Sequence, residues 1–259
     1  MTPRQIREVD FYAEYRWPEE VCFDPVLGRE SRPWNPNWFV YQFTMNRFQD
    51  HSQRLLDVGC GGGATTARFA KIGYEAHGID IAPSNIAAAE SVARRYVLEA
   101  RTRFSVQAIE SLNYPDGYFD AVTGIDVLHH VEVRDAVAEC LRVLRPGGFA
   151  IFKEWKESPF LDGLRMLSSV RHFFPKGKSL RRHITADERK LSREDLLAIQ
   201  ELCPDLTILP FRVFARLSRL IPGGRIRAFL ERTDQAAMRL VPALGRLGGA
   251  VVLVLDKRA

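Results

Sequence analysis

A glycine-rich turn between an apolar segment and a helix constrains the fold more than any other stretch of this sequence. Residues 55–70 read LLDVGCGGGATTARFA, with glycine at four of the five positions from 59 to 63. Glycine lets the backbone approach a ligand closely, and the first turn of the following helix presents unpaired N–H groups. A strand, a tight turn and a helix opening in this order are typical of a nucleotide-binding unit.

Strand-like and helix-like segments alternate through the middle of the chain. Five apolar segments predict strands, and three amphipathic segments predict helices between them: strands at 54–59, 74–80, 103–109, 118–128 and 148–155, and helices at 64–73, 84–100 and 133–145. We expect Ser84 to be the N-cap of the second helix. This order predicts a mostly parallel sheet with helices on both faces, and ligands at the carboxyl ends of its strands.

The C-terminal part of the chain predicts two further strands, at 205–214 and 250–258. An amphipathic helix is expected between them, because six positions recur at three- and four-residue steps: Ile226, Phe229, Leu230, Thr233, Ala237 and Leu240. The formal net charge is +5, but residues 1–150 carry −4 and residues 151–259 carry +9. The basic surplus fits an anionic substrate, a membrane surface or simply solvated helix faces.

Other compositional features exclude several classes of protein. The four cysteines form no CxxC or CxxH pair, so no metal site is predicted. No apolar run approaches the length of a membrane-spanning helix, and the N-terminal MTPRQIREVDFYAEY lacks the apolar centre of a signal peptide. We therefore expect a cytoplasmic protein.

The charge of Asp57 separates two candidate nucleotides. Gly59-x-Gly61-x-x-Ala64, with Asp80 about twenty residues on, matches the dinucleotide fingerprint, which several folds share. Asp57 ends the preceding strand, where its carboxylate would repel a pyrophosphate. S-adenosylmethionine carries an ammonium and a sulfonium and no phosphate, so that the same carboxylate attracts it.

Four ordered motifs carry a resemblance to a known family. DVGCGGG, GID, YPDGYFDAVTGIDVLHHV and LRVLRPGGFAIF, within residues 50–155, resemble the class I S-adenosylmethionine-dependent methyltransferases, in particular the bacterial group of the ubiquinone and menaquinone enzymes. The resemblance implies a Rossmann-like sheet of seven strands with the last antiparallel, and S-adenosylmethionine as cofactor. It also implies three parts: an N-terminal aromatic lid (1–50), a cofactor-binding core (51–156), and a C-terminal part of the sheet with helical substrate-cap insertions (157–259).

The resemblance assigns cofactor-binding roles residue by residue. The glycine-rich loop, which wraps the methionine part of the cofactor in the family, corresponds here to Asp57, Gly59, Gly61 and Gly63. Asp80 matches the acid that holds the ribose hydroxyls, and a carboxylate can accept from both.

Further expectations around the adenine and the amino group follow from the same resemblance. Ile81 is expected against the adenine, and Gly124 where backbone carbonyls meet the cofactor's amino group. Ala108 departs from the family, which commonly has an acid there to accept from the adenine amino group. Ile109 still offers its backbone N–H to the ring, and Glu110 is a candidate substitute for the missing acid.

Candidates for handling the acceptor lie after the predicted strands at 118–128 and 148–155. A hydroxyl acceptor must lose a proton as it attacks, and histidine suits that task. The candidates are Asp126, His129, His130 and Glu154, with His183 as an outsider in a basic stretch. Alternatively, His130 fixes its loop, or the enzyme only positions and desolvates the acceptor.

The sequence is compatible with three functions. The first is methyl transfer to an oxygen or carbon of a small apolar or amphipathic acceptor, with an anionic acceptor included. The second is action at a lipid surface through the basic segments 212–221 and 225–230, which mix arginine with large apolar residues. The third is cofactor binding without catalysis, suggested by Ala108 alone. Nucleic acid is not expected as a partner, because the chain has no known binding module.

Overall fold

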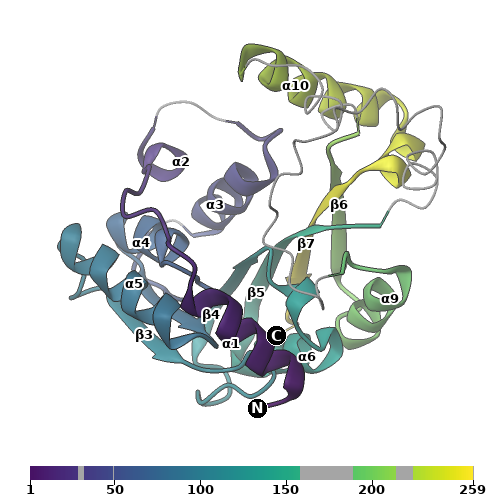
Figure 1. The fold of residues 1–259 in the computed structure, drawn as a ribbon. Helices are drawn as coiled ribbons and strands as arrows, with labels where there is room; N and C mark the ends of the chain where they lie inside the picture. Colours follow the sequence, from purple (N-terminus) through teal and green to yellow (C-terminus); the bar gives the residue numbers. More distant parts are fainter. Residues whose placement is uncertain (29–31, 49, 158–188, 214–223, 259) are drawn as a thin grey trace.

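A seven-stranded sheet forms the centre of the protein. The computed structural model describes residues 1–28, 32–48, 50–157, 189–213 and 224–258, and its strand order is β3-β2-β1-β4-β5-β7-β6 (Figure 1). β1 to β5 are parallel, and β7 is antiparallel to both β5 and β6, which confirms the predicted Rossmann-like sheet. The strands are β1 (Arg54–Val58), β2 (Glu75–Asp80), β3 (Thr102–Val106), β4 (Phe119–Ile125), β5 (Leu144–Trp155), β6 (Leu206–Phe211) and β7 (Ala250–Asp256).

Helices cover both faces of this sheet (Figure 1). One face carries α3 (Pro36–Arg47), α4 (Ala64–Lys71) and α5 (Pro83–Arg95), and the other carries α6 (Val133–Val143) and α9 (Arg193–Leu202). Successive residues of β1 serve the two cores in turn: Leu55 packs with Phe69 of α4, whereas Leu56 packs with Val137 of α6. This alternation is the period of two that a strand buried on both faces requires.

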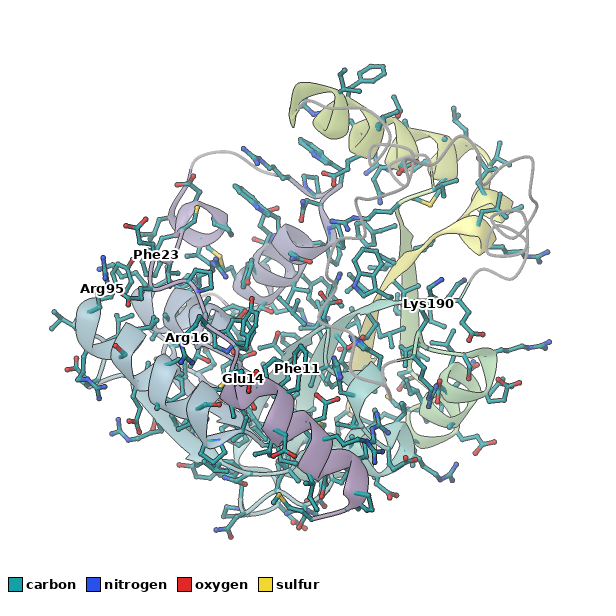
Figure 2. All side chains as sticks on the ribbon, in the orientation of Figure 1. Phe11, Glu14, Arg16, Phe23, Arg95 and Lys190 are labelled. Atoms are coloured by element: carbon teal, nitrogen blue, oxygen red, sulfur yellow. The ribbon has the colours of Figure 1, made fainter. Side chains whose placement is uncertain are left out.

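Five short or peripheral helices complete the described fold: α1 (Pro3–Ala13), α2 (Asp24–Leu27), the single turn η1 (Leu128–His130), α10 (Gly224–Leu240) and η3 (Pro242–Leu247). Between α1 and α2 the chain runs along α5, where Arg95 pairs with Glu19 at 3.0 Å and the ring of Phe23 meets that of Tyr96 (Figure 2). None of the helices in the described part of the chain is both long and apolar enough to cross a bilayer.

The second predicted helix begins and ends differently from the prediction. Its N-cap is Ala82, so the expectation for Ser84 is wrong: the Ser84 hydroxyl instead donates to the backbone carbonyl of Tyr12 at 3.0 Å. A carboxylate two residues before the N-cap holds the start of the helix instead, because Oδ1 of Asp80 accepts from the backbone N–H of Ala82 at 2.9 Å. The helix stops at Arg95 rather than at residue 100, since Val97 adopts a positive φ of 56°.

Candidate active site

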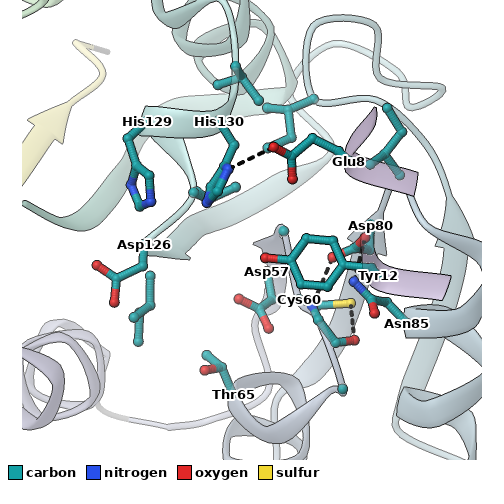
Figure 3. Close-up of a pocket in the computed structure, with 18 of the residues that line it drawn as sticks. Glu8, Tyr12, Asp57, Cys60, Thr65, Asp80, Asn85, Asp126, His129 and His130 are labelled. Carbon is teal, nitrogen blue, oxygen red and sulfur yellow. Dashed lines mark hydrogen bonds and ion pairs between the residues drawn. The ribbon is translucent and has the colours of Figure 1, made fainter. Parts of the chain in front are cut away.

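A cavity of about 960 Å³ opens at the carboxyl ends of the parallel strands, between the glycine turn and α1 (Figure 3). Six of the predicted cofactor residues line it: Asp57, Gly59, Gly61, Asp80, Ile81 and Ile109. Asp126, His129 and His130 line it as well. Gly63, Gly124 and Glu154 are not among the lining residues, and His183 lies outside the described residues.

The glycine turn has the backbone that its sequence requires. Gly59 and Gly61 have positive φ angles of 65° and 50°. A Cβ added to Gly59 would lie 2.2 Å from Cγ2 of Val127, and one added to Gly61 would lie 2.6 Å from the Trp17 ring. Any side chain at either position would therefore collide with the cavity wall, beyond the strain of its backbone.

Gly63 and Gly124 act in packing in this structure. Gly63 is the left-handed N-cap of α4, and a Cβ there would meet the Cβ of Ala89 at 2.7 Å. A Cβ on Gly124 would approach Val127 and the Phe152 ring to 2.8 Å. These glycines let α5 and the turn after β4 come close to the cavity, and a direct cofactor contact of either stays a prediction.

Asp80 organises the turn through three hydrogen bonds. Its Oδ2 accepts from the Gly61 backbone N–H at 3.0 Å, and its Oδ1 accepts from Ala82 N–H and from Nδ2 of Asn85 at 2.9 and 3.0 Å. Asn85 in turn accepts from the Trp17 indole N–H at 2.7 Å. Burial raises the pKa of Asp80 above its usual value, while these donors oppose the shift.

Asp57 is buried at the end of β1 beneath the turn (Figure 3). Its Oδ2 accepts from the Thr66 hydroxyl of α4 at 2.7 Å. Desolvation raises its pKa from 3.8 to about 7, against the hydrogen bond from Thr66. Near neutral pH the carboxylate is therefore poised between its charged and neutral forms, and a cation beside it favours the charged form.

A buried His–Glu pair stands at the far side of the cavity. Nδ1 of His129 lies 2.7 Å from Oε2 of Glu154, and Oε1 of Glu154 accepts from the backbone N–H groups of Val127 and Leu128, each at 2.7 Å. Glu154 is fully buried behind the cavity wall, and its carboxylate fixes the proton of His129 on Nδ1. In that tautomer Nε2 is the acceptor nitrogen of the neutral imidazole.

His130, the next residue, pairs with an acid that the sequence analysis did not identify. Its Nδ1 lies 3.1 Å from Oε1 of Glu8, a buried residue of α1 (Figure 3). Gln5, Glu8 and Tyr12 all line the cavity. Their spacing of three and four residues places them on one helix face, and this was the available signal. Arg4 of α1 donates to the backbone carbonyl of His129 at 3.3 Å, which is a second contact between α1 and the turn η1.

Asp126 pairs with a buried lysine. It has a positive φ of 58°, and its Oδ1 accepts from Nζ of Lys153 at 2.6 Å. Lys153 is buried, its ammonium lies 4.2 Å from the centre of the Trp155 ring, and burial lowers its pKa. Ligand atoms of Asp126, His129 and Glu154 lie within 4.8 Å of one another, but Lys153 already pairs with Asp126, and both Glu154 oxygens already accept.

The aromatic residues of the N-terminal segment divide between the cavity and the exterior. Tyr12 and Trp17 line the cavity and stack on each other with centroids 6.1 Å apart. Trp38 of the same segment is not among the lining residues, and the Arg32 guanidinium lies over its ring at 4.4 Å from the centroid. Trp155, at the end of β5, also lines the cavity.

Comparison with known proteins identifies the family. A methyltransferase domain model matches residues 56–152. A ubiquinone biosynthesis O-methyltransferase of Idiomarina loihiensis is 30% identical over 202 residues, covering 71% of this chain and 81% of that protein. The chain belongs to the class I S-adenosylmethionine-dependent methyltransferases.

Two further comparisons define how far the likeness reaches. The corresponding enzyme of Nitrosococcus oceani is 30% identical over 161 residues, covering 61% of this chain and 64% of that protein, and the chain spans between about half and two thirds of the first curated relatives it matches. The geranyl diphosphate C-methyltransferase of Streptomyces coelicolor, solved with Mg²⁺, geranyl diphosphate and S-adenosyl-L-homocysteine, superposes with a TM-score of 0.59 at 16% identity, covering 99% of both chains. That second likeness concerns the fold.

The cavity of this methyltransferase fits S-adenosylmethionine. Buried carboxylates at Asp57 and Asp80 flank a glycine turn that no side chain could occupy, and they suit a ligand with an ammonium, a sulfonium and ribose hydroxyls. Near the expected adenine site, the wall is formed by Ile81, Ala108 and Ile109. Glu110 also lines the cavity and accepts from the backbone N–H of Glu132 at 3.3 Å.

Proposed function

We propose that this methyltransferase moves a methyl group to an oxygen or carbon of a small, neutral, apolar or amphipathic acceptor. The observation that carries the proposal is one continuous cavity, with Asp57 and Asp80 at one end and His129 at the other. S-adenosylmethionine supplies the electrophilic methyl group when bound. The residues of the chain then have three tasks: to bind the cofactor, to orient the acceptor, and to accept its proton.

Charges on the cavity wall support a neutral acceptor over an anionic one. Among the described residues, the lining acids are Glu8, Glu20, Asp57, Asp80, Glu110 and Asp126, and the lining cations are Arg68, Arg189 and Lys190. Arg189 already forms a two-bonded ion pair with Asp195. An anion would meet more negative than positive side chains on this described part of the wall, at a cost that grows as water is excluded.

We assign the general base for a hydroxyl acceptor to His129. As the acceptor oxygen bonds to carbon, its proton passes to Nε2 of His129. The resulting imidazolium keeps its Nδ1–H directed at Glu154, whose negative charge stabilises it. His130 is the weaker candidate, because its carboxylate partner, Glu8 of α1, lies 3.1 Å away, against 2.7 Å between His129 and Glu154.

Calorimetry with S-adenosyl-L-homocysteine tests the cofactor half of this proposal. We expect micromolar binding to the wild type and its loss in Asp80→Ala, since three buried donors lose their acceptor. Asp10→Asn, an exposed change on α1, is the matched control. A wild type that binds no S-adenosyl-L-homocysteine would contradict the proposal.

The acceptor half is tested by mass spectrometry. The wild type is incubated with S-adenosylmethionine and a panel of phenols, catechols and prenylated quinols, and a product heavier by one methylene group is expected. Turnover of carboxylates or phosphates alone would overturn the preference for a neutral acceptor. Cofactor binding without turnover of any compound would favour the non-catalytic alternative.

A further inference from the structure

The helix α10 is packed with its acidic side chains inward. Glu231 and Asp234 are buried, whereas Ile226, Phe229 and Leu240 are exposed. Phe229 and Leu240 expose 64% and 83% of their surface. An amphipathic helix on a water-soluble domain normally buries its apolar side, so the orientation of α10 requires a reason.

An acidic residue on the buried side of α10 forms an ion pair with an arginine that lies near the cavity wall. Oε1 of Glu231 lies 3.8 Å from Nη2 of Arg212, the residue after β6. The Arg212 guanidinium lies 5.2 Å from the centre of the Trp155 ring, which lines the cavity. The acidic side of α10 is thus directed toward the acceptor end of the cavity, and the apolar side is directed away from it.

The exposed arc of α10 combines apolar and basic side chains. Along the described part of the helix and the turn after it, the exposed charged residues are Arg232, Arg239 and Arg246, and the acids Glu231 and Asp234 are buried. Arg232 also stacks over the Trp34 ring at 4.4 Å. Large apolar residues flanked by arginine, with no exposed acid beside them, are the composition of a helix that lies in a membrane interface.

α10 lies at the edge of the sheet where the cavity opens. β7 is antiparallel to both β5 and β6, so β6 runs parallel to β5 and both end at the edge of the sheet where the cavity opens. α10 follows β6 and lies beyond that edge, far from β3 and α5 (Figure 1). A surface bound to α10 would therefore lie on the cavity side of the molecule.

We propose that the exposed arc of α10, formed by Ile226, Phe229, Leu240 and Arg239, docks on an anionic lipid bilayer together with Arg246 of η3. An anionic surface is favoured over a second copy of this chain, because a two-fold interface would bring the arginines of one arc against those of the other. Docking is a binding property and does not depend on the methyl transfer proposed above.

Vesicle flotation tests this proposal with the full chain. We expect wild type to float with vesicles of equal parts phosphatidylglycerol and phosphatidylcholine, and to stay behind with phosphatidylcholine alone. Each basic side chain near an anionic surface contributes a factor of about five, so Arg239→Glu with Arg246→Glu should weaken binding by roughly 25-fold or more. Phe229→Ser with Leu240→Ser should weaken it by roughly tenfold or more.

Matched changes on α9 separate docking from general surface effects. Leu197→Ser removes another exposed apolar side chain, and Arg193→Glu reverses another exposed charge, and neither should change flotation. All variants should keep the wild-type affinity for S-adenosyl-L-homocysteine, which distinguishes a failure of docking from a failure of the methyltransferase proposal.

Three results would overturn the proposal. One is a wild type that does not float with anionic vesicles. Another is flotation that the α10 variants leave unchanged. The third is a dimer in sedimentation velocity that Phe229→Ser dissociates, which would identify a second copy of the chain as the occupant of the arc.

Discussion

His129 and Glu154 come from consecutive strand ends, and their side chains meet at 2.7 Å inside the protein, where Glu154 is completely shielded from water. The same carboxylate holds the backbone of Val127 and Leu128. Glu154 therefore orients both the imidazole and the turn that carries it, which makes it a positioning residue for the proposed base.

Substitution of this pair should lower turnover without loss of the cofactor. We expect His129→Gln to reduce kcat by roughly 100-fold for a hydroxyl acceptor, the usual contribution of a general base. Glu154→Gln should reduce kcat less and move the acidic limb of the pH–kcat profile to lower pH, because the protonated imidazole loses its carboxylate partner. His51→Gln, at a histidine that stacks on Tyr74, is the matched control. An unchanged pH profile in Glu154→Gln would contradict the assignment.

Asp57 predicts a pH dependence of stability. Its pKa is about 7 in the folded protein against 3.8 as the ordinary value, so the folded state holds a proton that the unfolded state has lost between these limits. Its contribution to the free energy of unfolding therefore falls as pH rises from about 4 to 7, by up to roughly 4 kcal/mol. Asp57→Asn should remove this loss.

Thermal melts across the same pH range check that prediction. Relative to wild type, Asp57→Asn should melt higher at pH 8 than at pH 5, while its affinity for S-adenosyl-L-homocysteine falls because the ammonium loses a carboxylate. Asp10→Asn should follow the wild-type curve, since Asp10 is exposed. If the melting temperatures of wild type and Asp57→Asn changed in parallel with pH, the pKa of Asp57 would not be raised.

Alanine substitutions at two glycines with positive φ distinguish the effect of backbone strain from the effect of a steric collision. Gly61→Ala should abolish cofactor binding and change the fluorescence of Trp17, because the new Cβ would lie 2.6 Å from that ring. Gly147 also has a positive φ, of 73°, but an added Cβ there meets nothing closer than 3.7 Å. Gly147→Ala should therefore cost only about 1 kcal/mol of backbone strain and leave binding intact. Equal losses of binding in both variants would exclude the collision as the cause.

The contact between Glu8 and His130 predicts how firmly α1 is held over the cavity. Glu8→Gln should speed backbone hydrogen exchange in α1 and weaken S-adenosyl-L-homocysteine binding several-fold, because a buried charge-assisted hydrogen bond is replaced by a neutral one. Glu14→Gln, at the exposed end of the same helix, should leave both measurements unchanged. Exchange in α1 that matches the wild type would indicate that the remaining contacts suffice.

The sequence predicted what depends on local pattern. The order of strands and helices, the glycine turn and the convergence of Asp57, Asp80 and His129 on one cavity follow from strand ends that meet at one edge of a parallel sheet. Contacts between distant segments were not predictable in this way. Glu8 reaches His130 across 122 positions, and no local pattern names that partner.

Local rules also failed where a tertiary contact replaced them. Serine is a preferred residue at an N-cap, but Ser84 is not the N-cap of α5. Asp80 instead accepts from the backbone N–H of Ala82, and the Ser84 hydroxyl donates to the backbone carbonyl of Tyr12. The periodicity of α10 correctly predicted a helix, but periodicity does not say which side faces the protein. In the structure Glu231, Asp234 and Met238 are buried, and Glu231 pairs with Arg212.

The close packing of Val127 against Gly59 has a consequence for how this enzyme can diverge. Val127 belongs to the turn that Glu154 holds, so a shift of the glycine turn at Gly59 would also disturb the backbone that carries the proposed base. We expect new acceptor preferences to arise from substitutions on α1 and beyond Trp155, while Gly59, Val127 and Glu154 stay unchanged.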